Sequence, residues 1–521
     1  MNVNLTKEQI GNNKNNLPDW AVFLPAVSSF YSTFVGKQRF GPYVDPARIP
    51  AGFTNGIEGL NFLDPEAGYF YYKWCLYSAG HAELDLNKFS EKEDMFRSRP
   101  RNGNSIVVGD SGGFQIGKGV WEGDWKDPNC PKAKKKREQV LAWMDGLMDY
   151  GMILDIPAWV ARSPAGAKAT GISSYQEAVN ATFINNDYFI RNRNGSCKFL
   201  NVLQGENHTE ADDWYNRQKK YADPKHYPGE HFNGWSMGGQ NMCDVHLVLR
   251  RLVALRFDGL IEKGYQDWMH FLGTSKLEWA CLLTDIQRAV RKYHNENFTI
   301  SFDCASPFLA TANGQVYIQT ETPHHKKWTY RMVPSVDNKK YSTDTRSFRD
   351  AVLQDKIFKN FDDSPISIKS LVKDVCVYAP GDLNKIGKEG RTSWDSFSYA
   401  IQMGHNVWMH INSVQEANRQ YDNGVIPNML FTEGFDRIYF RDVVDRIFET
   451  DDREKAEQLI EDYNKFWISI IGTRGATGKK TVNSSTFFNR HFDVEETPVE
   501  HHLDDSGLDE SNLEKLEESV E

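Results

Sequence analysis

Three aspartates directly follow short apolar segments that are rich in β-branched residues. Asp110 ends the run SIVVGD, Asp155 ends GMILD and Asp303 ends TISFD. One aspartate after a strand is more often a turn or capping residue, but several at equivalent strand ends favour a shared site. Carboxylates held together at the rim of an active site can act as nucleophiles or transfer protons, and Asp110 is a candidate for such a role.

Eight segments of this apolar kind occur along the chain, and helical patterns lie between most of them. Parallel strands joined by helices are typical of a (β/α)8 barrel, in which functional groups lie at the C-terminal ends of the strands. We therefore predict an α/β protein built on a (β/α)8 TIM barrel. The eight predicted strand segments are residues 20–28, 73–80, 105–113, 151–157, 198–205, 234–239, 269–275 and 299–306.

The remainder of the chain is predicted to form an accessory region and a tail. Residues 1–320 would hold the barrel, and residues 321–492 an accessory region with helices, including a helical apolar stripe over 451–471. Residues 493–521 contain twelve acidic residues and one lysine, a composition that is typical of a disordered tail. The net charge of −10 therefore belongs mostly to the tail, and the nearly neutral body does not exclude a nucleic-acid partner.

The sequence shows no segment apolar enough to span a membrane and no N-terminal secretory signal, so we predict a cytoplasmic protein without a membrane partner. Its cysteines are isolated, and no C-x-x-C motif occurs. Several basic segments could together form a phosphate-binding rim, although solvated surface is the alternative for each. These segments are Arg97–Arg101, Pro131–Arg137, His324–Trp328 and Lys339–Lys340.

The motifs at the ends of the predicted strands occur in a recognisable order: DSGGFQ, an aspartate, VLQG, SMGGQ, FLG and FDCASP. Over roughly residues 20–320 this order resembles the tRNA-guanine transglycosylase superfamily, whose members exchange a guanine in a polynucleotide for a 7-deazaguanine. The resemblance implies that Asp303 is the nucleophile and Asp110 the general acid/base, and that no cofactor is required. It also implies a base-binding set, in which Asp155 and Gln204 read the polar edge and Phe114 and Leu272 enclose the ring; the full set is Ser111, Phe114, Asp155, Gln204, Gly238, Gly239 and Leu272.

Two departures from the tRNA enzymes indicate a different polynucleotide. Those enzymes follow the nucleophile with Pro-Thr-Arg and a second arginine, whereas this chain reads PFLATANG over 307–314. They also bind zinc through three cysteines and a histidine, of which only Cys376 and His405 have counterparts here, so we predict that zinc is absent.

In these respects the chain is similar to the DNA 7-deazaguanine transglycosylases of phages and bacterial DNA-modification islands. The resemblance implies DNA and a free base such as preQ0 as partners, with the host cytoplasm as the location if the gene belongs to a phage. A homodimer or a helper protein is compatible with this reading. The alternatives are the same exchange on tRNA, a non-catalytic relative that binds nucleic acid, and a glycoside hydrolase on the same barrel.

Overall fold

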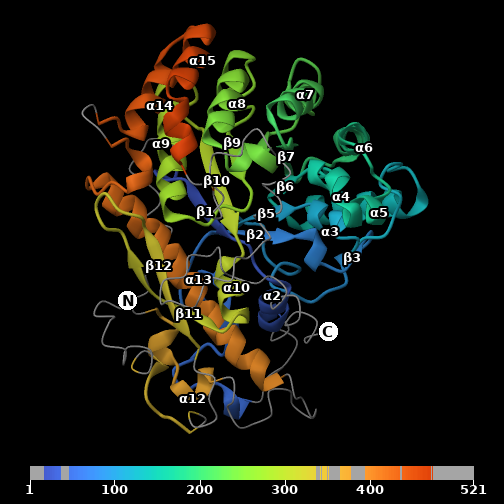
Figure 1. The fold of residues 1–521 in the computed structure, drawn as a ribbon. Helices are drawn as coiled ribbons and strands as arrows, with labels where there is room; N and C mark the ends of the chain where they lie inside the picture. Colours follow the sequence, from blue (N-terminus) through green and yellow to red (C-terminus); the bar gives the residue numbers. More distant parts are fainter. Residues whose placement is uncertain are drawn as a thin grey trace.

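The structure is a computed structural model that describes residues 17–36, 46–335, 341, 343–348, 350, 364–376, 393–433, 437–470 and 472. At its centre is a sheet of eight parallel strands in the order β1-β10-β9-β8-β7-β6-β5-β2 (Figure 1). Each of the eight predicted segments contains or overlaps one of these strands, so the predicted barrel is confirmed. The strands are β1 (Val22–Pro25), β2 (Trp74–Ser78), β5 (Ile106–Asp110), β6 (Tyr150–Met152), β7 (Lys198–Leu203), β8 (Gly234–Met237), β9 (Trp268–Phe271) and β10 (Thr299–Cys304).

The sheet closes between its two edge strands, β1 and β2. Ala26, just after β1, forms a parallel bridge with Leu76 of β2, and the Val27 N–H donates to the Leu76 carbonyl at 2.9 Å. Closure of this kind removes the exposed edges that an open sheet would present. All parallel strands of the barrel therefore end at one mouth.

Helices cover most of the barrel's outer surface. They are α4 (Pro131–Leu147), α6 (Tyr175–Asn192), α7 (His208–Gln218), α8 (Val245–Phe257) and α9 (Leu277–Tyr293), and each leads from one strand to the next. The connection from β2 to β5 is different, because it contains the short antiparallel hairpin of β3 (Leu84–Asp85) and β4 (Phe89–Ser90).

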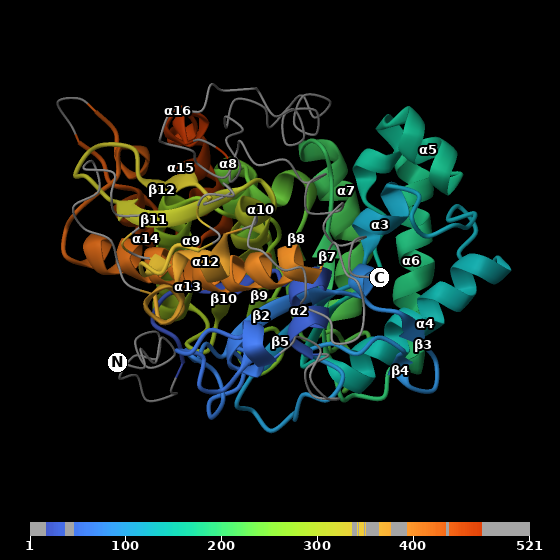
Figure 2. The same ribbon diagram turned by 90° about the horizontal axis from the view of Figure 1, so that it is seen from below.

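The long helix α13 (Ser393–Asp422) completes the ring of helices although it follows β10 only after a large insertion. It packs against α9, α10 (Ser306–Ala312), α2 (Ser29–Gly36) and β1, next to the hairpin of β11 (Gln315–Glu321) and β12 (Thr329–Pro334) (Figure 2). Strand β11 spans the predicted domain boundary at residue 320. The division of the chain at that residue stays a prediction.

Three C-terminal helices pack as an outer layer. Helix α14 (Phe440–Glu449) lies on α9, and α15 (Arg453–Asp462) and α16 (Asn464–Ser469) lie on α8. The apolar stripe over 451–471 thus forms two helices rather than one, with Tyr463 between them in a non-helical conformation (φ −99°, ψ 15°). The predicted disordered tail, 493–521, lies outside the described residues.

Candidate active site

The mouth of the barrel brings the predicted carboxylates together. Asp110 ends β5, Asp303 lies near the end of β10, and Asp155 follows β6. Burial raises the pKa of Asp110, the hydrogen bond from Ser78 opposes the rise, and the negative charge of Asp303 adds to it. Burial likewise raises the pKa of Asp155, to about 7, and the charge of Asp110 contributes. Electrostatic interaction therefore connects all three carboxyl groups.

Asp303 is held by donors from the neighbouring strand. Its Oδ1 accepts hydrogen bonds from the Gly273 N–H at 3.0 Å and from Nε2 of His270 at 3.0 Å. Its backbone carbonyl accepts from the Thr274 N–H at 2.7 Å. The carboxylate is only 11% exposed, so the donors on one oxygen fix its direction at the mouth.

Asp110 is positioned by the strand beside it and by a glycine turn. Ser78, its register partner on β2, donates to Oδ2 at 2.6 Å, and the Gly112 N–H donates to the same oxygen at 3.3 Å. Gly112 has a φ of +83°, and a Cβ there would lie 2.5 Å from Cη2 of Trp121. The turn after β5 therefore needs glycine both for its backbone conformation and for the close packing of Trp121.

Asp155 and Gln204 form a buried hydrogen-bonded pair. Nε2 of Gln204 donates to Oδ2 of Asp155 at 2.8 Å. The Gln204 backbone carbonyl accepts from the side-chain amide of Asn241 at 3.2 Å, which supports the loop after β7. Both predicted base-reading side chains are thus adjacent, in the loops that follow the consecutive strands β6 and β7.

The two glycines after β8 make room for this pair. A Cβ on Gly238 would lie 2.7 Å from Nε2 of Gln204, and a Cβ on Gly239, whose φ is +55°, would lie 2.7 Å from the Gly205 carbonyl oxygen. Gly113 makes a similar approach to Asp155, since its Cβ would lie 3.0 Å from that residue's carbonyl oxygen. Side chains at these positions would fill the space beside the polar pair.

Several buried polar atoms on the same loops have no hydrogen-bond partner. They are Oγ of Ser111, Oε1 of Gln115 and Oε1 of Gln204. Buried polar atoms are almost always paired in folded proteins. A polar ligand bound beside these side chains would supply the missing hydrogen-bond partners.

Phe114 and Leu272 are both half-buried at the mouth. The Phe114 ring lies 6.2 Å from that of Trp159, centroid to centroid, and the Lys118 ammonium lies 5.0 Å from the Phe114 ring centroid. Leu272 follows β9, two residues after His270. Their enclosure of a flat base between them stays a prediction.

Three polar residues near this site were not predicted from the sequence. His270 lies within an apolar strand, a pattern that indicates core packing, and Ser78 likewise ends an apolar strand. Glu206, two residues after Gln204, is 1% exposed, and neither of its carboxyl oxygens has a hydrogen-bond partner. Burial raises the pKa of Glu206 to about 8, and the charge of nearby Arg162 opposes the rise. The motif VLQG predicted only Gln204 as a site residue, and nothing local distinguished Glu206, the residue that follows the motif.

The two possible zinc ligands do not fit a metal site. His405 Nε2 lies 2.8 Å from the Tyr317 carbonyl oxygen, to which it must donate, and Nδ1 lies 2.7 Å from the Ser364 hydroxyl. Both ring nitrogens are therefore occupied by protein groups. Burial lowers the pKa of His405 to about 4, so the ring is neutral. Within the described part of the chain, no group of three or more histidine, cysteine or acidic residues could hold a metal ion.

The basic segments divide between the two ends of the barrel. Arg99 and Arg101 bond to carbonyl groups before β6, those of Leu147 and Met148. They therefore stabilise the end opposite the mouth, and this position does not support a place for them in a phosphate-binding rim at the mouth. The lysine run instead lies at the start of helix α4, in the connection that follows Asp110, and so on the mouth side. There the Lys136 ammonium lies 4.8 Å from the centroid of the Trp121 ring. Lys339 and Lys340 lie outside the described residues.

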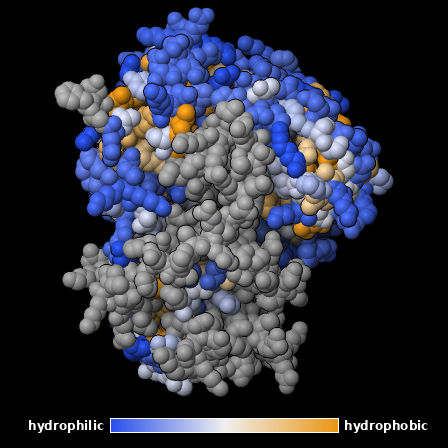
Figure 3. Space-filling model, in the orientation of Figure 1, coloured by the Kyte–Doolittle hydropathy of each residue, from blue (hydrophilic) through white to orange (hydrophobic). Residues whose placement is uncertain are grey.

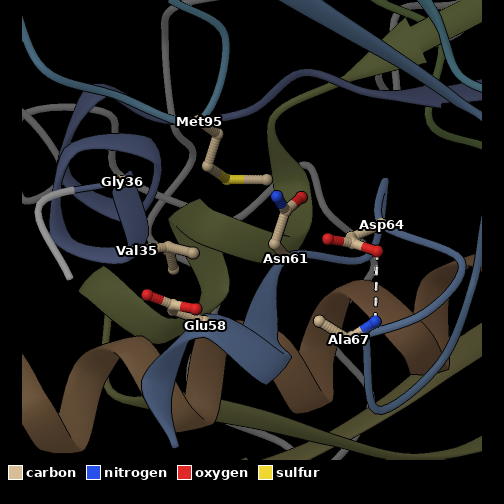
Figure 4. A pocket seen from close by; sticks show the side chains of 7 residues that line it. All are labelled: Val35, Gly36, Glu58, Asn61, Asp64, Ala67 and Met95. Carbon is tan, nitrogen blue, oxygen red and sulfur yellow. Dashed lines mark hydrogen bonds between the residues drawn. The ribbon is translucent and has the colours of Figure 1, made fainter. Parts of the chain in front are cut away.

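Two surface features lie apart from the mouth. A cavity of about 30 Å³, room for roughly one water, lies beside α2 (Figure 4) and is lined by Val35, Gly36, Glu58, Asn61, Asp64, Ala67 and Met95. A groove between α8 and α15 contains charged side chains that pair with one another, among them Lys219 and Arg453 with Asp258. The face over these two helices is mainly hydrophilic (Figure 3). Neither feature offers the arrangement of acids found at the mouth.

No helix of the described segments combines the length and the apolar character that crossing a lipid bilayer demands. Comparison of the chain with models of known protein families finds no matching family, and comparison with curated proteins likewise finds no match. Function must therefore be argued from the motifs and from the geometry of the mouth.

Proposed function

We propose that this protein is a DNA-guanine transglycosylase that exchanges guanine in DNA for a 7-deazaguanine base of the preQ0 type. The observation that carries the proposal is the meeting of three interacting carboxyl groups with an incompletely hydrogen-bonded polar pocket. Asp110 and Asp303 supply the pair of acids that a double displacement needs, and Asp155 with Gln204 supplies a polar edge for a base.

In the first displacement, a carboxylate oxygen of Asp303 attacks C1′ of the deoxyribose. The bond between C1′ and N9 of guanine breaks, its electron pair goes to the base, and Asp110 donates a proton to the leaving base. In the second displacement, the incoming base transfers its N9 proton to Asp110 and attacks C1′. The ester bond to Asp303 then breaks and its electron pair returns to the carboxylate. The raised pKa of Asp110 favours a carboxyl that is protonated before the first displacement and that takes up a proton again in the second.

The polar pair supports selection of guanine-like bases. An ionised Asp155 can accept hydrogen bonds from both the ring N–H and the exocyclic amine of guanine, and adenine offers no such pair of donors. The unpaired atoms Oγ of Ser111 and Oε1 of Gln204 are available to the remaining edge of the base. A base must leave its stack to reach this pocket, as in other enzymes that act on bases in DNA.

The segment that follows Asp303, the proposed nucleophile, supports DNA rather than tRNA as the substrate. The residues PFLATA, which replace the arginine-containing loop of the tRNA enzymes, lie in helix α10, and Phe308 is fully buried with its ring 5.5 Å from that of Tyr31. A buried apolar helix offers no cation to an RNA phosphate at this place. The lysine run at the start of α4 gives a basic segment on the mouth side.

The decisive experiment incubates the protein separately with DNA and tRNA that carry radiolabelled guanine, together with unlabelled preQ0. We expect label release and preQ0 incorporation, measured by nucleoside mass spectrometry, on DNA alone. Exchange on tRNA alone would support the tRNA alternative, and DNA binding without exchange would support a non-catalytic role. The matched control is Asp303→Asn, which keeps the shape of the side chain and removes the nucleophile.

A further inference from the structure

His270 occupies the middle of a hydrogen-bonded chain that ends on Asp303. Its side chain is fully buried, with Nε2 at 3.0 Å from Oδ1 of Asp303 and Nδ1 at 2.8 Å from Oγ of Ser301. Ser301 precedes Asp303 by two residues on β10, so both side chains face the barrel interior. Trp268, two residues before His270 on β9, places Nε1 at 2.8 Å from the same Ser301 oxygen.

The direction of two hydrogen bonds in this chain follows from groups that can only donate or only accept. An indole N–H can only donate, so Ser301 Oγ accepts from Trp268. Oδ1 of Asp303 already accepts from the Gly273 N–H, so the proton in its contact with His270 lies on Nε2. Ser301 Oγ keeps its own proton and a second lone pair, and either one can meet Nδ1 of His270.

We infer that His270 is a positioning residue for the nucleophile, held by Ser301 and Trp268 in the orientation in which Nε2 donates to Asp303. This inference rests on the proposed function, because it takes Asp303 as the group that attacks the sugar. Oδ1 receives two N–H donors, from His270 and from Gly273, which leaves the carboxylate directed so that Oδ2 meets C1′.

The two donors have different consequences for the two displacements. During attack they hold the carboxylate in one orientation, so that less conformational freedom is lost on reaching the transition state. During the second displacement the carboxylate is the leaving group, and the N–H donors stabilise the charge that returns to it. His270 therefore affects the chemical step and leaves binding of the free base to the other residues of the mouth, Asp155 and Gln204 among them.

The first measurement is the ¹⁵N spectrum of protein labelled in histidine, at neutral pH, with the His270 signals assigned by loss in His270→Gln. We expect a protonated Nε2. A proton on Nδ1 alone would overturn the inference, because Nε2 could then not donate to Asp303. This measurement does not depend on catalytic activity, so its result can be interpreted even if the proposed function is wrong.

The second measurement compares exchange kinetics of His270→Phe and Ser301→Ala with those of the wild type. We expect kcat to fall about 10- to 100-fold, the usual effect of losing a hydrogen bond to a charged group, and KM for free preQ0 to change less than about twofold. His270→Gln can donate to Asp303 and accept from Ser301, and should restore kcat to within about fivefold of the wild type. Full activity of His270→Phe would contradict the assigned role.

A matched control is His410→Phe. His410 is also fully buried, but it faces the outer side of β10, with Nε2 at 3.5 Å from Sγ of Cys304. This variant should lower the melting temperature without lowering kcat, measured under the same conditions. An equal loss of kcat in both histidine variants would show that general loosening of the barrel, and no specific contact with Asp303, causes the effect. Absence of exchange by the wild type on both polynucleotides would instead count against the proposed function alone.

Discussion

Asp303 is the residue on which the proposed chemistry depends most directly. Asp303→Asn removes the nucleophile but keeps an oxygen that can accept from His270 and Gly273. We expect base exchange to fall by at least about 10³-fold, because the covalent step is lost, while the melting temperature stays close to that of the wild type. Guanine release and thermal unfolding would be measured on the same preparation. Exchange at a tenth of the wild-type rate would remove Asp303 from this role.

Asp155 is expected to connect base binding to pH. Its pKa in the folded protein is raised from 3.8 to about 7 by burial, so the carboxyl is mostly neutral below pH 7. Recognition of two base N–H donors needs the ionised form, and affinity for free preQ0 should therefore fall about tenfold per pH unit below 7. Titration calorimetry between pH 5.5 and 8.5 measures this dependence. A flat profile would contradict the assignment of Asp155 to the base edge.

The same group should make folding less favourable at high pH. Because the folded pKa lies above the unfolded value, the stability that the neutral carboxyl contributes is complete below pH 4 and is lost as the pH rises through 7. Asp155→Asn stays neutral and keeps an oxygen for Gln204. The variant should therefore melt at a higher temperature than the wild type at pH 8, at about the same temperature at pH 4, and bind preQ0 poorly throughout.

At the scale of elements, the turn after β5 offers a sharp test of packing. Gly112 and Gly103 both have a φ of +83°, but a Cβ on Gly103 would meet no atom within 4 Å, whereas one on Gly112 would meet Trp121. Gly103→Ala should cost about 1 kcal/mol of unfolding free energy, from its backbone conformation alone. Gly112→Ala should cost about 1–3 kcal/mol more and reduce exchange, since the turn holds Asp110. Denaturant titration and exchange rates of both variants decide this.

The elements also show which features can be predicted from sequence. The eight strands were predictable because each is a short apolar run that ends in polar residues or glycine, and that local pattern needs no knowledge of distant contacts. The position of α13 was not predictable, because it completes the ring only after the insertion that follows β10. His270 was hidden for a related reason: its partner Ser301 is 31 positions away, and nothing local distinguishes it from a core residue.

At the scale of the whole molecule, Arg256 attaches the C-terminal layer to the barrel. It is 8% exposed, donates to the carbonyls of Phe448 and Thr450 at 2.7 and 2.8 Å, and pairs with Asp451 at 2.9 Å. Arg256→Met should cost about 2–3 kcal/mol of stability and speed hydrogen exchange in α14 and α15. Arg250→Met is the control, because its pair with Asp212 is solvent-exposed and should contribute less than about 1 kcal/mol. Equal effects of the two substitutions would argue against this attachment.

The closure of the barrel between β1 and β2 has a consequence for catalysis. In the described residues these strands share one bridge, from Ala26 to Leu76, whereas the adjoining pairs β10–β1 and β2–β5 have registers of four and five residues. Asp303 lies on the β10–β1 side of this seam and Asp110 on the β5–β2 side. The separation of the proposed nucleophile and proton donor is thus set across the joint with the fewest paired residues in the sheet. If the proposed chemistry is right, small movements of that joint would change the width of the reaction centre.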